Sequence, residues 1–134
     1  MADKLTLINP PGLHPTSGYA HVTIAAAGRT AHLAGLCPLD ENEAVVGLGD
    51  LDAQIDQVVA NGLRILAAID TQPKDVVRSV IYVMCYDSRV LAGAWDRLME
   101  SELAPALATA STLLGVTCLG YAGQLIEIDL TVAM

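Results

Sequence analysis

Residues 76–84 read VVRSVIYVM, a short and nearly uninterrupted run of β-branched and apolar residues. A run of this kind is typical of a strand that is covered by a helix on at least one face. The sequence therefore predicts a central strand here, and the flanking segments indicate what surrounds it.

Both flanks of this strand show helical spacing. Apolar residues recur at helical intervals over 51–66, and Asp50 is a candidate N-cap in front of them. Beyond the strand, Asp87 or Ser88 can cap a second helix whose apolar stripe runs over 91–103. Core packing is the expected role of that stripe, because a stripe at this spacing normally faces a protein interior.

Two further pairs of β-rich segments complete the pattern. Residues 19–26 and 30–34 predict a β-hairpin, and the proline-rich residues before Gly18 predict an extended lead-in without regular structure. Residues 111–119 and 124–133 predict a closing hairpin. The order β-β-α-β-α-β-β predicts one α+β domain over 1–134, with a mixed sheet and both helices on one face. Self-association would cover the other, apolar face.

The composition excludes several classes of function. The formal net charge is −8 and aromatic residues make up only 4% of the chain, so we expect no nucleic-acid partner. The mean hydropathy is +0.47, but no apolar run approaches the roughly 20 residues that span a bilayer. Without a secretory signal at its start, the chain is expected to be cytoplasmic and to have no membrane partner.

Cysteine and histidine spacing predicts no metal site. The three cysteines form no CxxC pair, and the three histidines show no spacing typical of metal ligands. The glycines of 47–49 lack the remaining residues of a phosphate loop, so no cofactor is expected.

Four features in order resemble the RidA/YjgF family of reactive-intermediate deaminases, which are also described as L-PSP endoribonuclease-like. These are SGYAH at 17–21, AGLCP at 34–38, a helix that carries Gln54 and Asn61, and LIEID at 125–129. The similarity spans nearly the whole chain. It implies a chorismate-mutase-like fold with a six-stranded mixed sheet, and a homotrimer with a central barrel and a small-molecule cleft between subunits.

The resemblance also implies an activity, the hydrolysis of reactive enamines and imines to ketones and ammonia. In the family site an Arg grips the substrate carboxylate, a Tyr lines the cleft and a Glu helps to handle water; the corresponding residues here are Ala110, Tyr19 and Glu127. The remaining cleft residues that the resemblance implies are Gly35, Leu36, Cys37, Ala92 and Thr112.

Ala110 departs from the family pattern, because no Arg stands close by in 108–112. A methyl group cannot pair with a carboxylate, and losing a charge-assisted contact costs about 1.5–3 kcal/mol, or roughly 10–100-fold in affinity. Ala34 and Ala92 replace a Ser and an Asn that are frequent in the family. We therefore expect a pocket with few polar groups, suited to a neutral or non-standard substrate.

The candidate catalytic side chains are Glu127, Tyr19 and His21. Alternation places Glu127 and Asp129 on one strand face, and a Glu in an apolar cleft can exchange protons with water; a solvated strand face is the alternative. Tyr19 and His21 also share a face, so His21 could compensate for the absent Arg, or could be a partly exposed strand residue. For Tyr19, packing and cleft roles both remain open. Cys37 has no Lys, Arg or His beside it in sequence, so we expect an inert thiol.

Two functions from different classes follow. The first is an enzyme that processes an enamine or imine without the usual Arg. The second is a non-catalytic trimer that binds a small molecule or regulates a partner. A third, endoribonuclease activity, is disfavoured by the charge of −8 and the scarcity of aromatic residues for base stacking.

Overall fold

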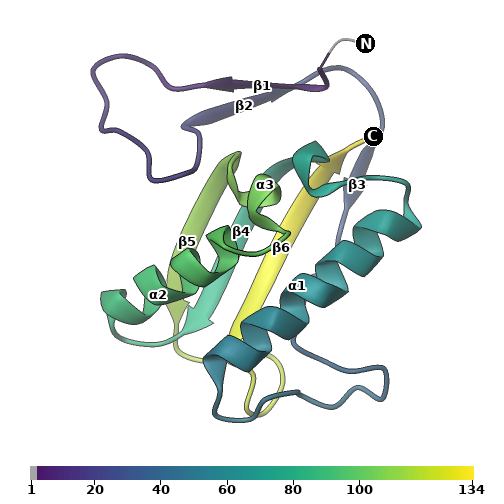
Figure 1. Cartoon of the computed structure of the whole chain (residues 1–134), viewed down its shortest axis with the longest axis vertical. Helices are drawn as coiled ribbons and strands as arrows, with labels where there is room; N and C mark the ends of the chain where they lie inside the picture. Colours follow the sequence, from purple (N-terminus) through teal and green to yellow (C-terminus); the bar gives the residue numbers. More distant parts are fainter. Residues whose placement is uncertain (1–2) are drawn as a thin grey trace.

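A four-stranded mixed sheet in the order β3-β6-β4-β5 forms the centre of the structure, a computed structural model that describes residues 3–134 (Figure 1). A separate two-stranded sheet pairs β1 with β2. The strands are β1 Leu5–Ile8, β2 Val22–Ala25, β3 Thr30–His32, β4 Val76–Met84, β5 Ala110–Val116 and β6 Ile126–Ala133. The α+β class is confirmed, but the six strands form two sheets rather than the expected single sheet.

Strand β4 occupies the central position that the sequence predicts. It pairs in parallel with β5 and antiparallel with β6. Ile81 and Val83 are fully buried on the helix side, whereas Val80 and Tyr82 are half-buried on the other side. A strand that is apolar on both faces is stable between two neighbouring strands and beneath helices, so it takes the middle of the sheet.

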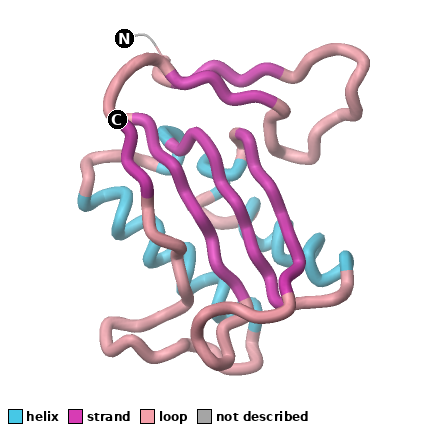
Figure 2. The backbone as a smooth tube through the Cα atoms, turned by 180° about the vertical axis from the view of Figure 1, so that it is seen from behind, coloured by secondary structure: helices cyan, strands magenta, loops and turns pink. Residues whose placement is uncertain are grey.

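Helices α1 and α2 begin at the predicted caps. Helix α1, Leu51–Ala68, starts where the Asp50 side chain accepts from Ala53 N, and α2, Ser88–Met99, starts at Asp87. Two shorter helical segments follow the long helices. The 3₁₀ turn η1, Pro73–Asp75, comes after α1, and α3, Ala104–Leu107, comes after α2. All helices lie on one face of the four-stranded sheet (Figure 2). In the described part of the chain, none of them is both long and apolar enough to cross a membrane.

The first predicted hairpin is wrong. Strand β2 pairs antiparallel with β1, and β3 pairs with β6, so the chain passes from one sheet to the other between them. The sequence analysis expected no regular structure before Gly18, but Leu5–Ile8 precedes the prolines and can donate to a ladder along its whole length. Each ladder is extended by one backbone bond at this crossing, from Ala26 N to Lys4 O beside β1 and β2 and from Met134 N to Arg29 O beside β3 and β6.

The predicted closing hairpin is also wrong. Strands β5 and β6 do not pair with each other, because β4 lies between them. The intervening residues 117–125 are long enough to pass around the end of β4, which a tight turn could not do. The turn residues at 120–123 suggest that β5 and β6 pair with each other. Instead, each of them pairs with the apolar strand β4.

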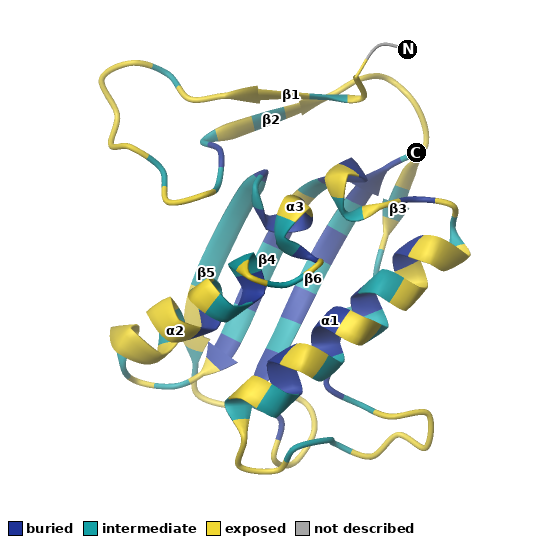
Figure 3. Cartoon of the chain, in the orientation of Figure 1, coloured by how far each residue is buried: buried dark blue, intermediate teal, exposed yellow. Residues whose placement is uncertain are grey.

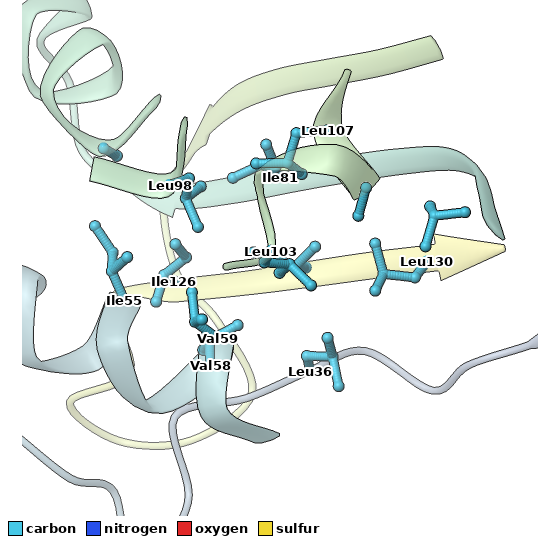
Figure 4. Close-up of a cluster of buried hydrophobic side chains, with 14 of the residues drawn as sticks. Leu36, Ile55, Val58, Val59, Ile81, Leu98, Leu103, Leu107, Ile126 and Leu130 are labelled. Carbon is cyan, nitrogen blue, oxygen red and sulfur yellow. The ribbon is translucent and has the colours of Figure 1, made fainter. Parts of the chain in front are cut away.

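The core fills the space between the helices and the four-stranded sheet (Figure 4). Leu103 belongs to it although α2 ends at Met99, before the predicted limit of the stripe. The largest fully buried apolar side chains are Ile55, Leu66, Ile81, Leu98, Leu103, Leu107, Ile126 and Ile128. Met84 of β4 and Leu114 of β5, which point away from the helices, remain exposed. Along β4 and β6 the colour alternates between buried and intermediate, as expected of a sheet with one covered face (Figure 3).

Gln54 connects α1 to the chain that enters β6. Its side chain is fully buried, and its Nε2 donates to Gly47 O at 3.1 Å and to Gly123 O at 2.9 Å. Its Oε1 accepts from Leu125 N at 2.7 Å. One buried amide side chain therefore satisfies three backbone groups and fixes the position at which β6 begins.

Replacing Gln54 with Ala should lower the free energy of unfolding by about 2–4 kcal/mol, because a fully buried side chain is removed and three backbone groups lose their partners. Urea unfolding followed by circular dichroism measures this loss. Gln57→Ala on the same helix is the matched control. Its amide makes one long backbone bond of 3.4 Å and one bond to Asn61, so we expect a loss below about 1 kcal/mol. Equal losses in the two variants would contradict this assignment.

Candidate functional site

Glu127 is the centre of a polar cluster near the start of β6. Its Oε1 accepts from Cys37 Sγ at 3.1 Å and from Gln124 Nε2 at 3.1 Å. Gln124 is buried, and Glu127 is half-buried. The carboxylate is therefore held by two neutral donors, with no cation paired to it in the part of the chain that is described.

Gly35 allows the Glu127 carboxylate to lie against the backbone. A Cβ atom at Gly35 would collide with Glu127 Oε2. The adjacent Leu36 exchanges backbone bonds with Ile128, of 2.8 Å and 3.1 Å, and its side chain is buried in the core. The loop after β3 is thus attached to β6, and the missing side chain of Gly35 makes room for the acid.

A cleft of about 940 Å³ opens beside this loop. Gly35, Leu36 and Cys37 border it, and α1 contributes Asn61 and Arg64. Asn61 Nδ2 donates to Cys37 O at 3.1 Å and to Leu39 O at 2.9 Å. Helix α1 therefore positions the loop that carries the Cys37 thiol to Glu127.

The Cys37 thiol is protonated at neutral pH. Burial raises its pKa to about 11, with smaller contributions from its hydrogen bond to Glu127 and from the charge of that carboxylate. A thiol in this state is a hydrogen-bond donor rather than a nucleophile. This agrees with the expectation of an unreactive thiol and leaves Glu127 as the group able to accept a proton.

Tyr19 and His21 lie close together, although both precede β2 rather than belonging to a strand. Their ring centroids are 6.2 Å apart, and each ring also approaches His14. Tyr19 Oη and His14 Nε2 share a hydrogen bond of 2.7 Å, and His21 Nδ1 lies 3.2 Å from Asn9 Oδ1. His21 Nε2 is shielded from solvent and has no hydrogen-bond partner among the described residues.

A second cleft, of about 470 Å³, lies between the Tyr19 segment, α2 and β5. It contains the predicted residues Tyr19 and Ala92, and also Trp95, which the sequence analysis assigned to core packing. Trp95 does pack against the core, but its Nε1 donates to Ser17 O at 3.1 Å. The signal available in the sequence was that a lone Trp needs a partner for its N–H and so tends to lie at a boundary.

Ala110 and Thr112 border neither of these two clefts. They share the open face of the sheet with Arg78, which is in register with Ala110 and donates from its NH2 to Thr112 Oγ1 at 2.9 Å. The Arg78 guanidinium on the neighbouring strand β4 thus lies next to Ala110. Arg78 is far from Ala110 along the chain, and the predicted closing hairpin gave no indication that β5 pairs with β4.

The predicted site residues form two groups in one chain. Glu127, Gly35, Leu36 and Cys37 gather on the β3 side of the sheet, whereas Tyr19 and Ala92 lie beside β5 and α2. Strand β4 separates the two groups. Over residues 3–134, no cluster of three or more His, Cys, Asp or Glu side chains is arranged to hold a metal ion.

The Glu127→Gln variant should lower the pKa of the Cys37 thiol, because the negative charge beside it is removed. The pKa should stay above the ordinary 9.0, since burial is the largest cause of the shift. At pH 8 we expect alkylation of Cys37 by iodoacetamide to become about 10-fold faster, as the thiolate fraction rises.

Peptide mass spectrometry can resolve Cys37 from Cys85 and Cys118 in this experiment. Asp129→Asn, a carboxylate change on the same strand face, is the matched control and should leave the rate at Cys37 nearly unchanged. An unaltered rate in Glu127→Gln would show that the carboxylate does not control this thiol.

Comparison with known proteins identifies the family. Residues 11–134 match the family model described as Endoribonuclease L-PSP. Comparison with curated protein sequences returned no match. Among solved structures, the chain is similar to YyfB of Yersinia pestis, a protein of unknown function of the conserved Rid protein family. The identity is 32%, the TM-score is 0.87, and the match covers 98% of this chain and 100% of that one.

Two more distant structures share the fold. YyfA of Yersinia pestis, also of the Rid family, is 17% identical with a TM-score of 0.69, over 97% of this chain and 99% of that one. A member of the YjgF/YER057c/UK114 family from Mycobacterium tuberculosis is 22% identical with a TM-score of 0.62, over 87% of both chains. The match of residues 11–134 to the family model and the 32% identity to YyfB show that this chain belongs to the Rid (YjgF) family.

Proposed function

We propose that this protein hydrolyses small reactive enamines or imines to a carbonyl compound and ammonia, with Glu127 managing the water. The observation that carries the proposal is the Glu127 carboxylate, which Cys37 and Gln124 hold beside Gly35. Gly35 and Cys37 in turn border the cleft of about 940 Å³. Two neutral donors fix the orientation of this carboxylate without pairing its charge with a cation. Such a group remains free to accept a proton.

The proposed chemistry needs one proton acceptor and no cofactor. Water adds to the carbon of the C=N bond as Glu127 takes one of its protons and the nitrogen gains a proton from solvent, which gives a carbinolamine. Glu127 then passes its proton to the nitrogen, the hydroxyl proton is released to solvent as the C=O bond forms, and ammonia leaves. The balance is one imine and one water to one ketone and one ammonia, and the enamine enters after tautomerisation to the imine.

The complete site requires more than one copy of the chain in this proposal. Glu127 and Tyr19 lie on opposite sides of β4, so one chain cannot place both against a small substrate. Strands β3 and β5 are the two edges of the four-stranded sheet, and the exposed Met84 and Leu114 lie on its uncovered face. A homotrimer that joins these edges in a ring would cover that face and bring the two groups together.

The proposed substrate is neutral or otherwise non-standard, without a carboxylate, because among the described residues no Lys or Arg borders the cleft that Tyr19 lines and Ala92 adds no hydrogen bond from α2. Ala110 lies outside this cleft, beside Arg78 on the open face of the sheet. Arg78 already donates to Thr112 on the open face of the sheet, away from the cleft that Tyr19 lines.

A non-catalytic binding protein is the second candidate. The aromatic cleft beside β5 favours it, because that cleft is well formed even though Glu127 is distant from it within the chain. The net charge of −8 argues against RNA as the ligand, despite the name of the matching family model.

The Glu127→Gln variant should lower kcat for ammonia release from freshly generated neutral imines by about 10²–10⁴-fold, because water loses its proton acceptor. Asp129→Asn is the matched control. Asp129 shares the strand face but is placed against Tyr82 Oη at 3.4 Å, so we expect less than about a threefold change.

Native mass spectrometry of both variants establishes that the oligomer is intact. Wild-type protein that releases no ammonia from any imine of the panel would contradict the enzyme proposal and favour the binding protein. Equal losses in the two variants would contradict the specific role of Glu127.

A further inference from the structure

The aromatic walls of the second cleft are fixed at their polar ends. Trp95 Nε1 donates to Ser17 O, and Tyr19 Oη shares a hydrogen bond with His14 Nε2. The two rings meet edge to face, with centroids 6.2 Å apart and planes at 85°. Because each polar group already has a partner, the ring surfaces that border the cleft are left for apolar or cation–π contacts.

The loop in front of Trp95 preserves this arrangement. Gly18 has φ +89°, a conformation that side-chain-bearing residues rarely adopt. A Cβ at Gly18 would lie 3.0 Å from the Met99 side chain and 3.9 Å from Trp95. Glycine favours this backbone conformation and lets the loop lie close to α2, where the Ser17 carbonyl reaches the indole. The cleft wall is preorganised rather than formed by a mobile surface ring.

A single charged side chain borders the cleft, and it is acidic. Asp96 follows Trp95 on α2, and the other residues around it are small or apolar: Ser17, Ala92, Ser111 and Leu113. Within residues 3–134 the Asp96 carboxylate makes no ion pair, because Arg97 turns instead to Asp52 and Asp56. A carboxylate next to two aromatic rings favours a cation over an anion.

We propose that this cleft selects the cationic, protonated form of an imine with an apolar substituent, and that Trp95 and Asp96 determine this specificity. This inference rests on the proposed function, since an iminium ion is the form of an imine that water attacks most readily. Trp95, Tyr19 and Leu113 contact the apolar substituent, and the indole face and Asp96 attract the positive charge. A substrate carboxylate is repelled by Asp96 and finds no cation among the residues that border the cleft.

The position of Trp95 gives a direct binding measurement. It is the only Trp in the chain, so intrinsic fluorescence excited at the indole reports on this cleft without any turnover. Three stable probes share one branched carbon skeleton: 3-methylbutylamine as the cation, 3-methylbutanamide as the neutral probe and 3-methylbutanoate as the anion. We expect the amine to bind at least about 5-fold more tightly than the amide, with no saturable response to the carboxylate.

Two variants separate the contributions of charge and ring. Asp96→Asn should weaken amine binding by about 3-fold and leave amide binding unchanged, because Asp96 is exposed and its attraction is screened. Tyr19→Leu retains the indole reporter and should weaken both of these probes. Glu100→Gln, a charge change at the end of the same helix and outside the cleft, is the control and should leave all three affinities unchanged.

The inference is overturned if the carboxylate binds as tightly as the amine, or if Asp96→Asn leaves amine binding unchanged. Ammonia release from the corresponding imines distinguishes this failure from failure of the proposed function. If the protein binds the probes in the expected order but hydrolyses no imine, the proposed cleft specificity stands and the proposed enzymatic function fails. If the protein hydrolyses carboxylated imines without any change in Trp95 fluorescence, the proposed enzymatic function stands and the proposed cleft specificity fails.

Discussion

The two-sided pairing of β4 is the constraint on which the rest of the structure depends. Its apolar residues favour a position with a neighbouring strand on each side, and β5 and β6 are those neighbours. Residue Tyr82 is in register with Glu127 on one side and with Leu114 on the other. The same pairing that stabilises the sheet therefore separates the acid on β6 from the aromatic cleft beside β5. Within one chain a small substrate cannot contact both groups, and the proposed homotrimer would bring them together.

Local signals in the sequence predicted the helices and the central strand but not the pairing of strands. Both helices begin at the expected aspartates, since a cap acts within one turn of its own helix. Strand partners depend on competition among distant segments. The turn at 120–123 suggested a hairpin, whereas the stronger requirement of β4 for neighbours separated β5 from β6. Strand β1 was not predicted, because it is short and directly precedes the proline-rich segment that begins at Pro10.

The candidate site shows the same limit. The resemblance placed Gly35, Cys37 and Glu127 in one site, and they do meet, because the loop after β3 is bonded to β6. It did not reveal that Arg78 reaches Thr112, since that contact depends on parallel pairing between strands far apart in the sequence. The apolar stripe of α2 concealed Trp95 in a similar way. One side chain can pack against the core and also form the wall of a cleft.

A site shared between two copies can be tested directly by mixing two inactive variants. Glu127→Gln and Tyr19→Ala proteins are unfolded together and refolded, so that the proposed trimers would contain both chains at random. If each site takes Glu127 from one chain and Tyr19 from its neighbour, about a quarter of the sites in an equal mixture regain both residues, and ammonia release rises to about that fraction of the wild-type rate. Mixed trimers seen by native mass spectrometry with no recovered activity would contradict the shared site.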